Sequence, residues 1–267
     1  MSFLRRLFKR KVTKKRLDSK LKRFISRFGE TSDAKTVEKF LKENEMKDEF
    51  LSYLVKIKFA KGSEKERLIK EAKKIADKIP SFKGWPEKPV KFWDIESLSW
   101  RTKIPVHVRL FIRKELLKRI KLGGLNLSLG AGSYPYIEDS VLVDISSEML
   151  KAVEPAVKFK RKLVYDLEKG NLPFKDSVFD TVTMVFVINY LKNLETVFKE
   201  IYSVLKKKGK VIIVQSGKLL EELYIRQEKK QYKADELKKL LEKIGFKVKV
   251  EKKRIKRTQL VFVEAIK

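Results

Sequence analysis

The chain has 267 residues, enough for one domain of about 150 residues and a second module. Its 65 Lys and Arg against 35 Asp and Glu give a net charge of +30, which favours a polyanionic partner, with RNA as the first choice. The absence of cysteine and the single histidine exclude disulfides, thiolate nucleophiles, thiolate metal sites and His-rich metal sites.

Hydropathy and composition also bear on where the protein works. No stretch of about 18 uninterrupted apolar residues occurs, so we expect no transmembrane segment and a soluble, cytoplasmic protein. The lack of cysteine and the single histidine lead us to expect no bound metal. The Lys/Glu-rich, cysteine-free composition indicates a thermophilic source.

The first 27 residues are strongly basic, with a single acid and apolar residues at helical spacing. They fit an RNA-binding arm, a membrane-surface helix or presequence, or a solvated helix. We favour the RNA-binding arm, whose candidate phosphate contacts are Arg5, Arg6, Lys9, Arg10, Lys11, Lys14, Lys15 and Arg16.

Helical patterns follow at residues 34–59 and 63–79. The stretch 80–92, PSFKGWPEKPVKF, holds three prolines and a glycine and is predicted to be a linker. Pro105 can open a further helix that runs to about residue 120. We therefore predict a basic helical N-terminal module over residues 1–120 and a second domain over residues 121–267.

From residue 125 onward, short apolar segments alternate with helical ones. This alternation predicts an α/β domain with a Rossmann-like, doubly wound and mostly parallel sheet. The last two segments are joined by only a few residues, which predicts an antiparallel hairpin at its edge. The predicted strands are LNLSL, VLVD, KLVYD, FDTVTMVF, KVIIVQ, KVKVEKK and TQLVFVEAI.

Glycines and acids stand at the expected carboxyl ends of the first three strands. Gly130 and Gly132 fall in the first turn, where glycine lets the backbone approach a ligand. Asp144 ends the second strand, where a carboxylate can accept hydrogen bonds from two ribose hydroxyls, and Asp166 ends the third, where it can accept from an adenine amino group. Together these strand ends outline an adenosine site. NAD is disfavoured, because Pro135 stands where the dinucleotide spacing needs a third glycine.

Five segments in order carry a resemblance to a known family: LNLSLGAG, VLVDISSEML, YDLEKGNLPFKDSVFD, TVTMVFVINYL and LETVFKEIYSVLKKKGKVIIV. They resemble the class I, Rossmann-like S-adenosylmethionine-dependent methyltransferases, in the type 11-like group with an LPF-x-D-x-x-FD signature. The resemblance covers about residues 124–266. It departs from the family in the short SYPYIED connection, which is predicted to form a loop or short turn instead of a helix.

The resemblance implies S-adenosylmethionine as cofactor and assigns roles to individual residues. It places the loop Gly130, Ala131 and Gly132 beneath the methionine and ribose, Asp144 at the ribose, and Asp166 and Leu167 at the adenine. Ile145, next to Asp144, is a further candidate for cofactor binding. The resemblance also places Asn189 and Tyr190 at the methyl-transfer centre, as catalytic candidates.

The composition limits which chemical groups can accept the methyl group. Methylation of pyrimidine C5 ordinarily needs a covalent cysteine adduct, which this chain cannot form. Amines, ring nitrogens and ribose hydroxyls remain. Aromatic and basic residues alternate around residues 82–103 and either grip unpaired RNA bases and phosphates or pack the helical module against the sheet.

The sequence thus favours an RNA methyltransferase that acts on a base nitrogen of ribosomal RNA, for instance an exocyclic amine of cytidine or adenosine. A tRNA substrate is the second choice. Two rivals stay open: a methyltransferase for a protein or small molecule, and a non-catalytic RNA-binding assembly factor.

Overall fold

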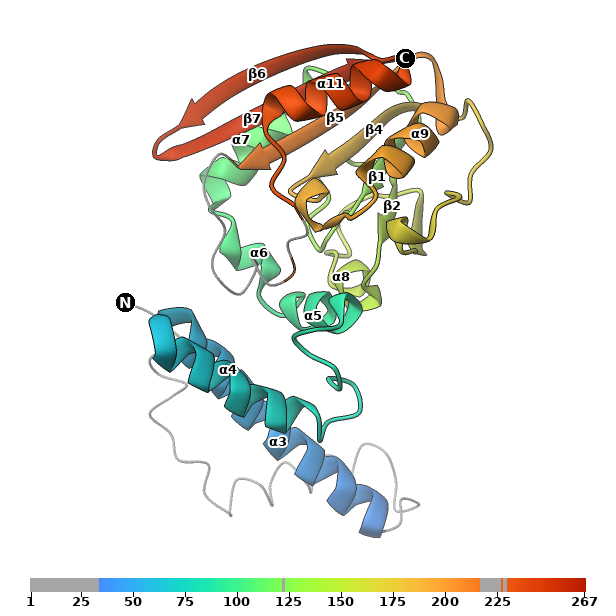
Figure 1. Ribbon diagram of the computed structural model, residues 1–267. Coiled ribbons are helices and arrows are strands. Elements are labelled where there is room, and N and C mark those ends of the chain that lie inside the picture. The colour runs from blue at the N-terminus through green and yellow to red at the C-terminus, as the bar shows by residue number, and fades with distance from the viewer. Residues whose placement is uncertain (1–33, 122, 217–226, 228–229) are drawn as a thin grey trace. The chain divides into compact units, whose positions relative to one another are not determined.

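The computed structural model describes residues 34–121, 123–216, 227 and 230–267 (Figure 1). The eight basic residues predicted to bind RNA, between positions 5 and 16, lie outside these ranges. The chain divides into two compact units, Met1–Ile79 and Pro80–Lys267. Within the described ranges, no helix is long and apolar enough to cross a bilayer.

The first unit contains two helices, as predicted: α3 (Ala34–Phe59) and α4 (Gly62–Ala76). Only two residues join them, so they fold back on each other as a helical hairpin. Apolar side chains of both helices and of the following turn form its interior: Phe50, Ile57, Leu68, Ile69, Ala72, Ala76 and Ile79.

The second unit is built on a seven-stranded sheet in the order β3-β2-β1-β4-β5-β7-β6. The first five strands along the chain are parallel, and β7 is antiparallel to both β5 and β6. The predicted α/β fold with an antiparallel C-terminal hairpin is confirmed. The strands are β1 (Asn126–Leu129), β2 (Ser140–Asp144), β3 (Arg161–Val164), β4 (Phe179–Val185), β5 (Leu205–Ser216), β6 (Lys247–Ile255) and β7 (Thr258–Ile266).

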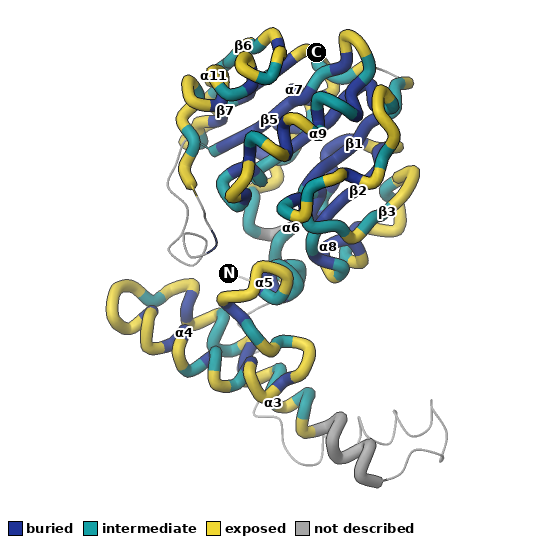
Figure 2. The backbone as a smooth tube through the Cα atoms, turned by 45° about the vertical axis from the view of Figure 1, so that its right-hand side comes forward, coloured by how far each residue is buried: buried dark blue, intermediate teal, exposed yellow. Residues whose placement is uncertain are grey.

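Helices cover both faces of the sheet, and the central strands are buried between them (Figure 2). Alternate residues of β5 point to opposite faces. Val211 and Ile213 pack with α9 (Leu194–Val204) and α11 (Ala234–Ile244), whereas Ile212 and Val214 pack with α7 (Val106–Leu117). Helix α8 (Ser147–Lys151) lies beside β2 and β3, and two short 3-10 helices, η1 (Leu167–Lys169) and η2 (Ile188–Tyr190), follow β3 and β4.

The division between the units differs from the predicted boundary at residues 120/121. Helix α7 was assigned to the N-terminal module, but Val108, Ile112 and Leu116 form one apolar cluster with β5 and β7. The boundary therefore lies at residues 79/80. An amphipathic pattern shows that a helix has a buried face but does not identify what covers that face.

The predicted linker at residues 80–92 is also corrected. Trp85 is fully buried, and α5 (Pro89–Glu96) begins inside this stretch, followed by α6 (Trp100–Lys103). Pro89 stands in the first turn of α5, where a proline is tolerated because no intrahelical N–H is needed. The prolines therefore mark a turn and a helix start, and this segment belongs to the second unit.

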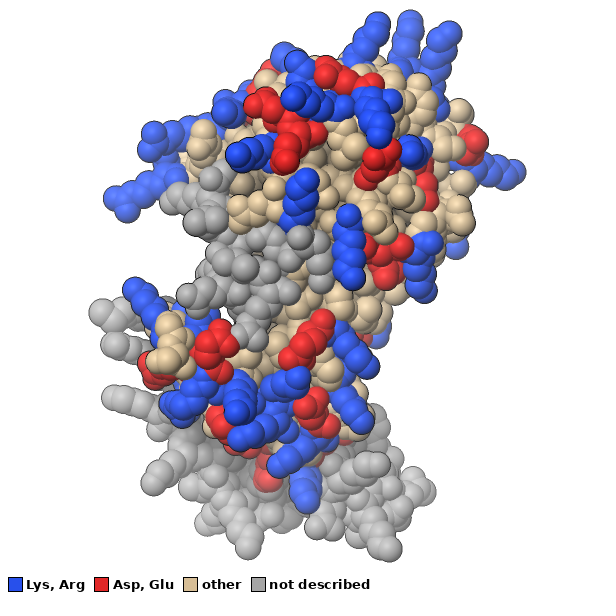
Figure 3. Space-filling model, viewed as in Figure 1, with Lys and Arg blue, Asp and Glu red and all other residues tan. Residues whose placement is uncertain are grey.

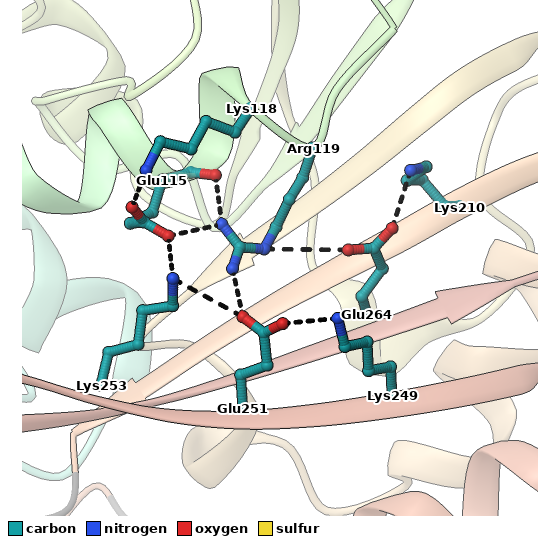
Figure 4. A network of polar contacts seen from close by, with 8 residues as sticks. All are labelled: Glu115, Lys118, Arg119, Lys210, Lys249, Glu251, Lys253 and Glu264. Atoms are coloured by element: carbon teal, nitrogen blue, oxygen red, sulfur yellow. Dashed lines mark hydrogen bonds and ion pairs between the residues drawn. The ribbon is translucent and has the colours of Figure 1, made fainter.

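A network of ion pairs fastens the end of α7 to the hairpin (Figure 4). The buried carboxylate of Glu115 accepts hydrogen bonds from Lys118 at 2.6 Å, Arg119 at 2.8 Å and Lys253 at 2.5 Å. Arg119 also donates to Glu251 at 2.5 Å. Burial alone would raise the pKa of Glu115, but these donors outweigh it and lower the pKa to about 2. Hydrogen bonds from Lys249 and Arg119 likewise lower the pKa of Glu251 to about 2.

This network predicts an acid-sensitive stability. A carboxyl with a lowered pKa in the folded state stabilises the fold above its unfolded pKa, near 4.3 for Glu, and this stabilisation is lost as the pH falls toward about 2. We expect the melting temperature to fall between about pH 5 and pH 2. Glu115→Gln should lower the stability at neutral pH by roughly 1–3 kcal/mol, because the buried side chain loses its charge-assisted hydrogen bonds from Lys118, Arg119 and Lys253. The variant should also lose much of the fall in melting temperature at low pH.

Thermal unfolding followed by circular dichroism across this pH range checks the expectation. Glu242→Gln, an exposed change on α11, is the matched control and should keep the wild-type profile. A Glu115→Gln profile that runs parallel to the wild type would contradict the assigned role of this carboxylate.

Candidate functional site

A cavity of about 400 Å³ lies at the carboxyl ends of β1, β2 and β4, within the second unit. This volume is in the range of small-molecule sites. Its walls come from the loops after these strands, from η1 and η2, and from α5 and α6. Seven of the nine residues predicted for cofactor binding and catalysis line it: Gly130, Gly132, Asp144, Ile145, Asp166, Leu167 and Tyr190.

The glycine loop after β1 needs both of its glycines. Gly130 and Gly132 have φ values of 63° and 58°, which favour glycine. A Cβ on Gly130 would lie 2.4 Å from Val187 Cγ2, and one on Gly132 would lie 2.9 Å from Trp100 Nε1. Ala131, between the two glycines, is buried, and its N–H donates to the Val143 carbonyl at 3.0 Å. Ala131 therefore ties the loop to β2 and does not line the cavity.

Asp144 is the best-fixed acid of the site. One carboxylate oxygen accepts from the Gly132 N–H at 2.8 Å and the other from the Ser146 N–H at 2.9 Å. Burial raises the pKa of this carboxyl, against the opposing effect of these N–H groups. Each oxygen keeps a lone pair for a further donor. The residue can thus hold a vicinal diol such as the ribose of a nucleoside.

Asp166 and Leu167 form the next part of the wall, after β3. Asp166 is the N-cap of η1, and its carboxylate accepts from the Glu168 N–H at 3.0 Å. Leu167 is buried and presents an apolar surface to the cavity. This pairing of an apolar contact with a polar acceptor fits an adenine ring with its amino group.

The two catalytic candidates on η2 lie in different places. Tyr190 lines the cavity, and its ring centroid is 5.0 Å from that of Trp93. Asn189 does not line the cavity: its side-chain oxygen accepts from Gln215 Nε2 at 2.9 Å. Of the two predicted catalytic residues, only Tyr190 therefore lines this cavity, because consecutive residues of a short 3-10 turn point in different directions.

The sequence did not predict that α5 and α6 would help to build the site. Trp93 and Trp100 line the cavity and pack edge to face at 5.6 Å, whereas Trp85 is fully buried. Asp94 of α5 accepts from Ser146 Oγ at 2.7 Å, and Ser146 in turn donates its N–H to Asp144. Proline at the start of α5 was the signal that could have identified this helix.

Among the described residues, no group of three or more His, Cys, Asp or Glu is arranged to hold a metal ion.

The connection between β1 and β2 contains turns and no helix, as predicted for the SYPYIED stretch.

Comparisons with known proteins bear out the resemblance. The family described as "Methyltransferase domain" matches residues 123–213. The uncharacterized protein MJ1123 of Methanocaldococcus jannaschii is 31% identical over 199 residues, covering 68% of this chain and 86% of that protein. A demethylmenaquinone methyltransferase of Geobacillus is 36% identical over 78 residues, which are 28% of this chain and 33% of the enzyme.

Among solved structures, the fold is similar to a chain in the complex between the Haloferax volcanii Trm112 methyltransferase activator and a methyltransferase. The TM-score is 0.53 at 16% identity, covering 67% of this chain and 96% of that chain. The match shows the fold alone. The matched family and the cavity geometry together identify the chain as a class I, Rossmann-like methyltransferase whose methyl donor is S-adenosylmethionine.

Proposed function

We propose that this enzyme methylates a base nitrogen of RNA, with ribosomal RNA as the first choice of substrate and tRNA as the second. The observation that carries the proposal is the aromatic cluster of Trp93, Trp100 and Tyr190 on the wall of the cofactor cavity. Unpaired RNA bases are commonly recognised by stacking on such side chains.

The cofactor half of the cavity fits S-adenosylmethionine. Asp144 would hold the ribose hydroxyls, Leu167 and Asp166 the adenine, and the glycine loop would leave room for the methionine part. When bound, the cofactor supplies an electrophilic methyl group on a sulfonium. The chain itself has to align the acceptor for an in-line displacement and exclude water.

The acceptor half is aromatic. The Trp93 ring stands nearly perpendicular to both Trp100 and Tyr190, with interplanar angles of 89° and 82°. A planar base that enters this cluster would pack against the face or edge of an indole ring. It would be held mainly by these ring contacts and by few hydrogen bonds. Stacking on aromatic side chains contributes about 1–3 kcal/mol per base.

Charge favours RNA over a small acceptor. Residues 80–267, which contain the whole cavity, carry 40 Lys and Arg against 23 Asp and Glu, a net charge of +17. The basic N-terminal arm, with its eight candidate phosphate contacts at positions 5–16, would add to this attraction. A polyanion is therefore drawn to the unit that holds the methyl donor.

A second candidate acceptor is a small planar quinone. It is favoured by the similarity of part of this chain to demethylmenaquinone methyltransferases. That similarity spans 33–42% of the length of those enzymes. The same aromatic cluster would receive a quinone ring, but activity on a quinone should be insensitive to salt. RNA methylation should weaken steeply as salt rises.

The test is transfer of labelled methyl from S-adenosylmethionine to separated ribosomal RNA, tRNA, protein and lipid fractions. We expect label in ribosomal RNA, at a base nitrogen identified by nucleoside mass spectrometry, and none with the Asp144→Ala variant. Label confined to the lipid fraction would favour the quinone, and label confined to protein would contradict both acceptors.

Trp93→Ala tests the aromatic cluster within the same assay. It should lower transfer to RNA about tenfold or more and leave the affinity for S-adenosylhomocysteine nearly unchanged, and Trp93→Phe should restore most of the transfer. Equal loss in both variants would show that Trp93 acts by shaping the wall and not by stacking.

A further inference from the structure

We propose that the tip of the β6–β7 hairpin is a docking surface for the phosphates of RNA. The tip consists of Lys252 to Thr258, KKRIKRT, which holds five basic residues and no acid. This inference rests on the proposed RNA substrate and assigns part of its binding to a defined element. Figure 3 shows basic side chains projecting from the left end of this hairpin.

The charges at the tip are exposed and not neutralised. In the described part of the chain, no acidic side chain pairs with Lys252, Arg254, Lys256 or Arg257, and all four are exposed. Their neighbour Lys253 is different, since it is held by Glu115 at 2.5 Å. The network around Glu115 thus fixes the hairpin while leaving the four outer charges available.

The backbone of the turn supports a role beyond solubility. Lys256 and Arg257 form the two-residue turn between the strands, and Lys256 has a φ of 50°. Such turns strongly prefer asparagine or glycine, and a longer side chain there costs on the order of 1 kcal/mol. Lysines along an edge strand also discourage edge-to-edge aggregation, but that purpose does not require basic residues in the turn itself.

The tip lies at the carboxyl end of the parallel strands, as the cavity does. Ser216, the last residue of β5, pairs with Leu260 of β7, so residues 254–259 extend past the carboxyl end of β5. Val261 of β7 is the strand partner of both Lys252 on β6 and Gln215 on β5. The Gln215 side chain in turn donates a hydrogen bond to Asn189, which precedes Tyr190 in η2. Two strand spacings, about 10 Å, separate Lys252 from Gln215. RNA whose target base is in the cavity can therefore place flanking phosphates on the tip.

The experiment compares two fourfold variants of the full chain. In one, Lys252, Arg254, Lys256 and Arg257 are each changed to Gln. The matched control changes to Gln four exposed lysines that lie at the opposite end of the strands, near the starts of β4, β5 and β6: Lys175, Lys207, Lys208 and Lys247. Both variants lose the same charge, and both are first checked for wild-type affinity toward S-adenosylhomocysteine.

The probe is a fluorescent transcript of a ribosomal RNA segment, titrated at several salt concentrations. We expect the hairpin variant to bind it at least tenfold more weakly at about 0.1 M salt, with a salt slope smaller by about 3, and the control to stay close to wild type. Equal losses in the two variants, or wild-type affinity in the hairpin variant, would overturn the proposal. So would a hairpin variant that keeps RNA binding and loses binding to vesicles of anionic phospholipid.

The same variants separate this proposal from the proposed reaction. If the tip binds RNA but no RNA fraction accepts a methyl group, the docking surface stands and the acceptor assignment fails. If the hairpin variant binds and methylates RNA as the wild type does, the reaction stands and the docking surface fails.

Discussion

Asp144→Ala is expected to lower the affinity for S-adenosylhomocysteine by about 100-fold or more. The variant removes the charged acceptor for the two proposed hydrogen bonds from the ribose, each worth about 1.5–3 kcal/mol. The change also leaves the N–H groups of Gly132 and Ser146 without the oxygens that now hold them at 2.8 and 2.9 Å. The glycine loop should therefore lose its fixed position as well as its ligand contact. Isothermal titration calorimetry measures the affinity directly.

Two further variants sharpen this result. Asp144→Asn keeps one acceptor oxygen and should bind with intermediate affinity. Glu148→Ala, on the adjacent helix α8, removes an acid whose hydrogen-bond partners are Ser147 and Lys151, and should bind as the wild type does. Wild-type affinity in Asp144→Ala would show that the ribose does not lie at this carboxylate.

The central strands β1, β2 and β4 could be predicted closely because each is a short, largely apolar run near turn residues. Buried parallel strands leave this signal in the sequence without help from distant residues. The position of the acids followed for the same reason: Asp144 ends β2, and the carboxyl ends of parallel strands meet at one edge. Most of the cofactor wall was therefore accessible from sequence.

The aromatic wall of the cavity, formed by Trp93, Trp100 and Tyr190, was harder to predict because it depends on long-range packing. Trp93 and Trp100 follow the proline-bearing stretch 80–92 that was predicted to be a linker. Trp93 nevertheless packs against Tyr190, and Trp100 lies beside Gly132, both far along the chain. Asn189 and Tyr190 are neighbours in sequence, and only the geometry of η2 decides which of them faces the cavity. Local patterns carry no information about either choice.

Gly130→Ala is expected to weaken cofactor binding by tenfold or more through a collision. The new Cβ would lie 2.4 Å from Val187 Cγ2 and 3.0 Å from Val187 Cγ1, so the loop after β4 has to move. That loop includes Phe186, which already has a φ of 59°, and it leads into Tyr190 on the cavity wall. The positive φ of Gly130 adds a strain of about 1 kcal/mol. Affinity for S-adenosylhomocysteine and melting temperature are the two measurements.

Gly123→Ala separates the strain from the collision. Gly123 has a φ of 69°, but a Cβ there would meet nothing within 4 Å. This variant should lose about 1 kcal/mol of stability and keep its cofactor affinity, since it carries the backbone strain alone. The double variant Gly130→Ala, Val187→Ala removes both clashing methyl groups and should recover most of the affinity while retaining the strain. If it binds no better than Gly130→Ala, then the backbone conformation of the loop, and not its contact with Val187, makes glycine necessary at this position.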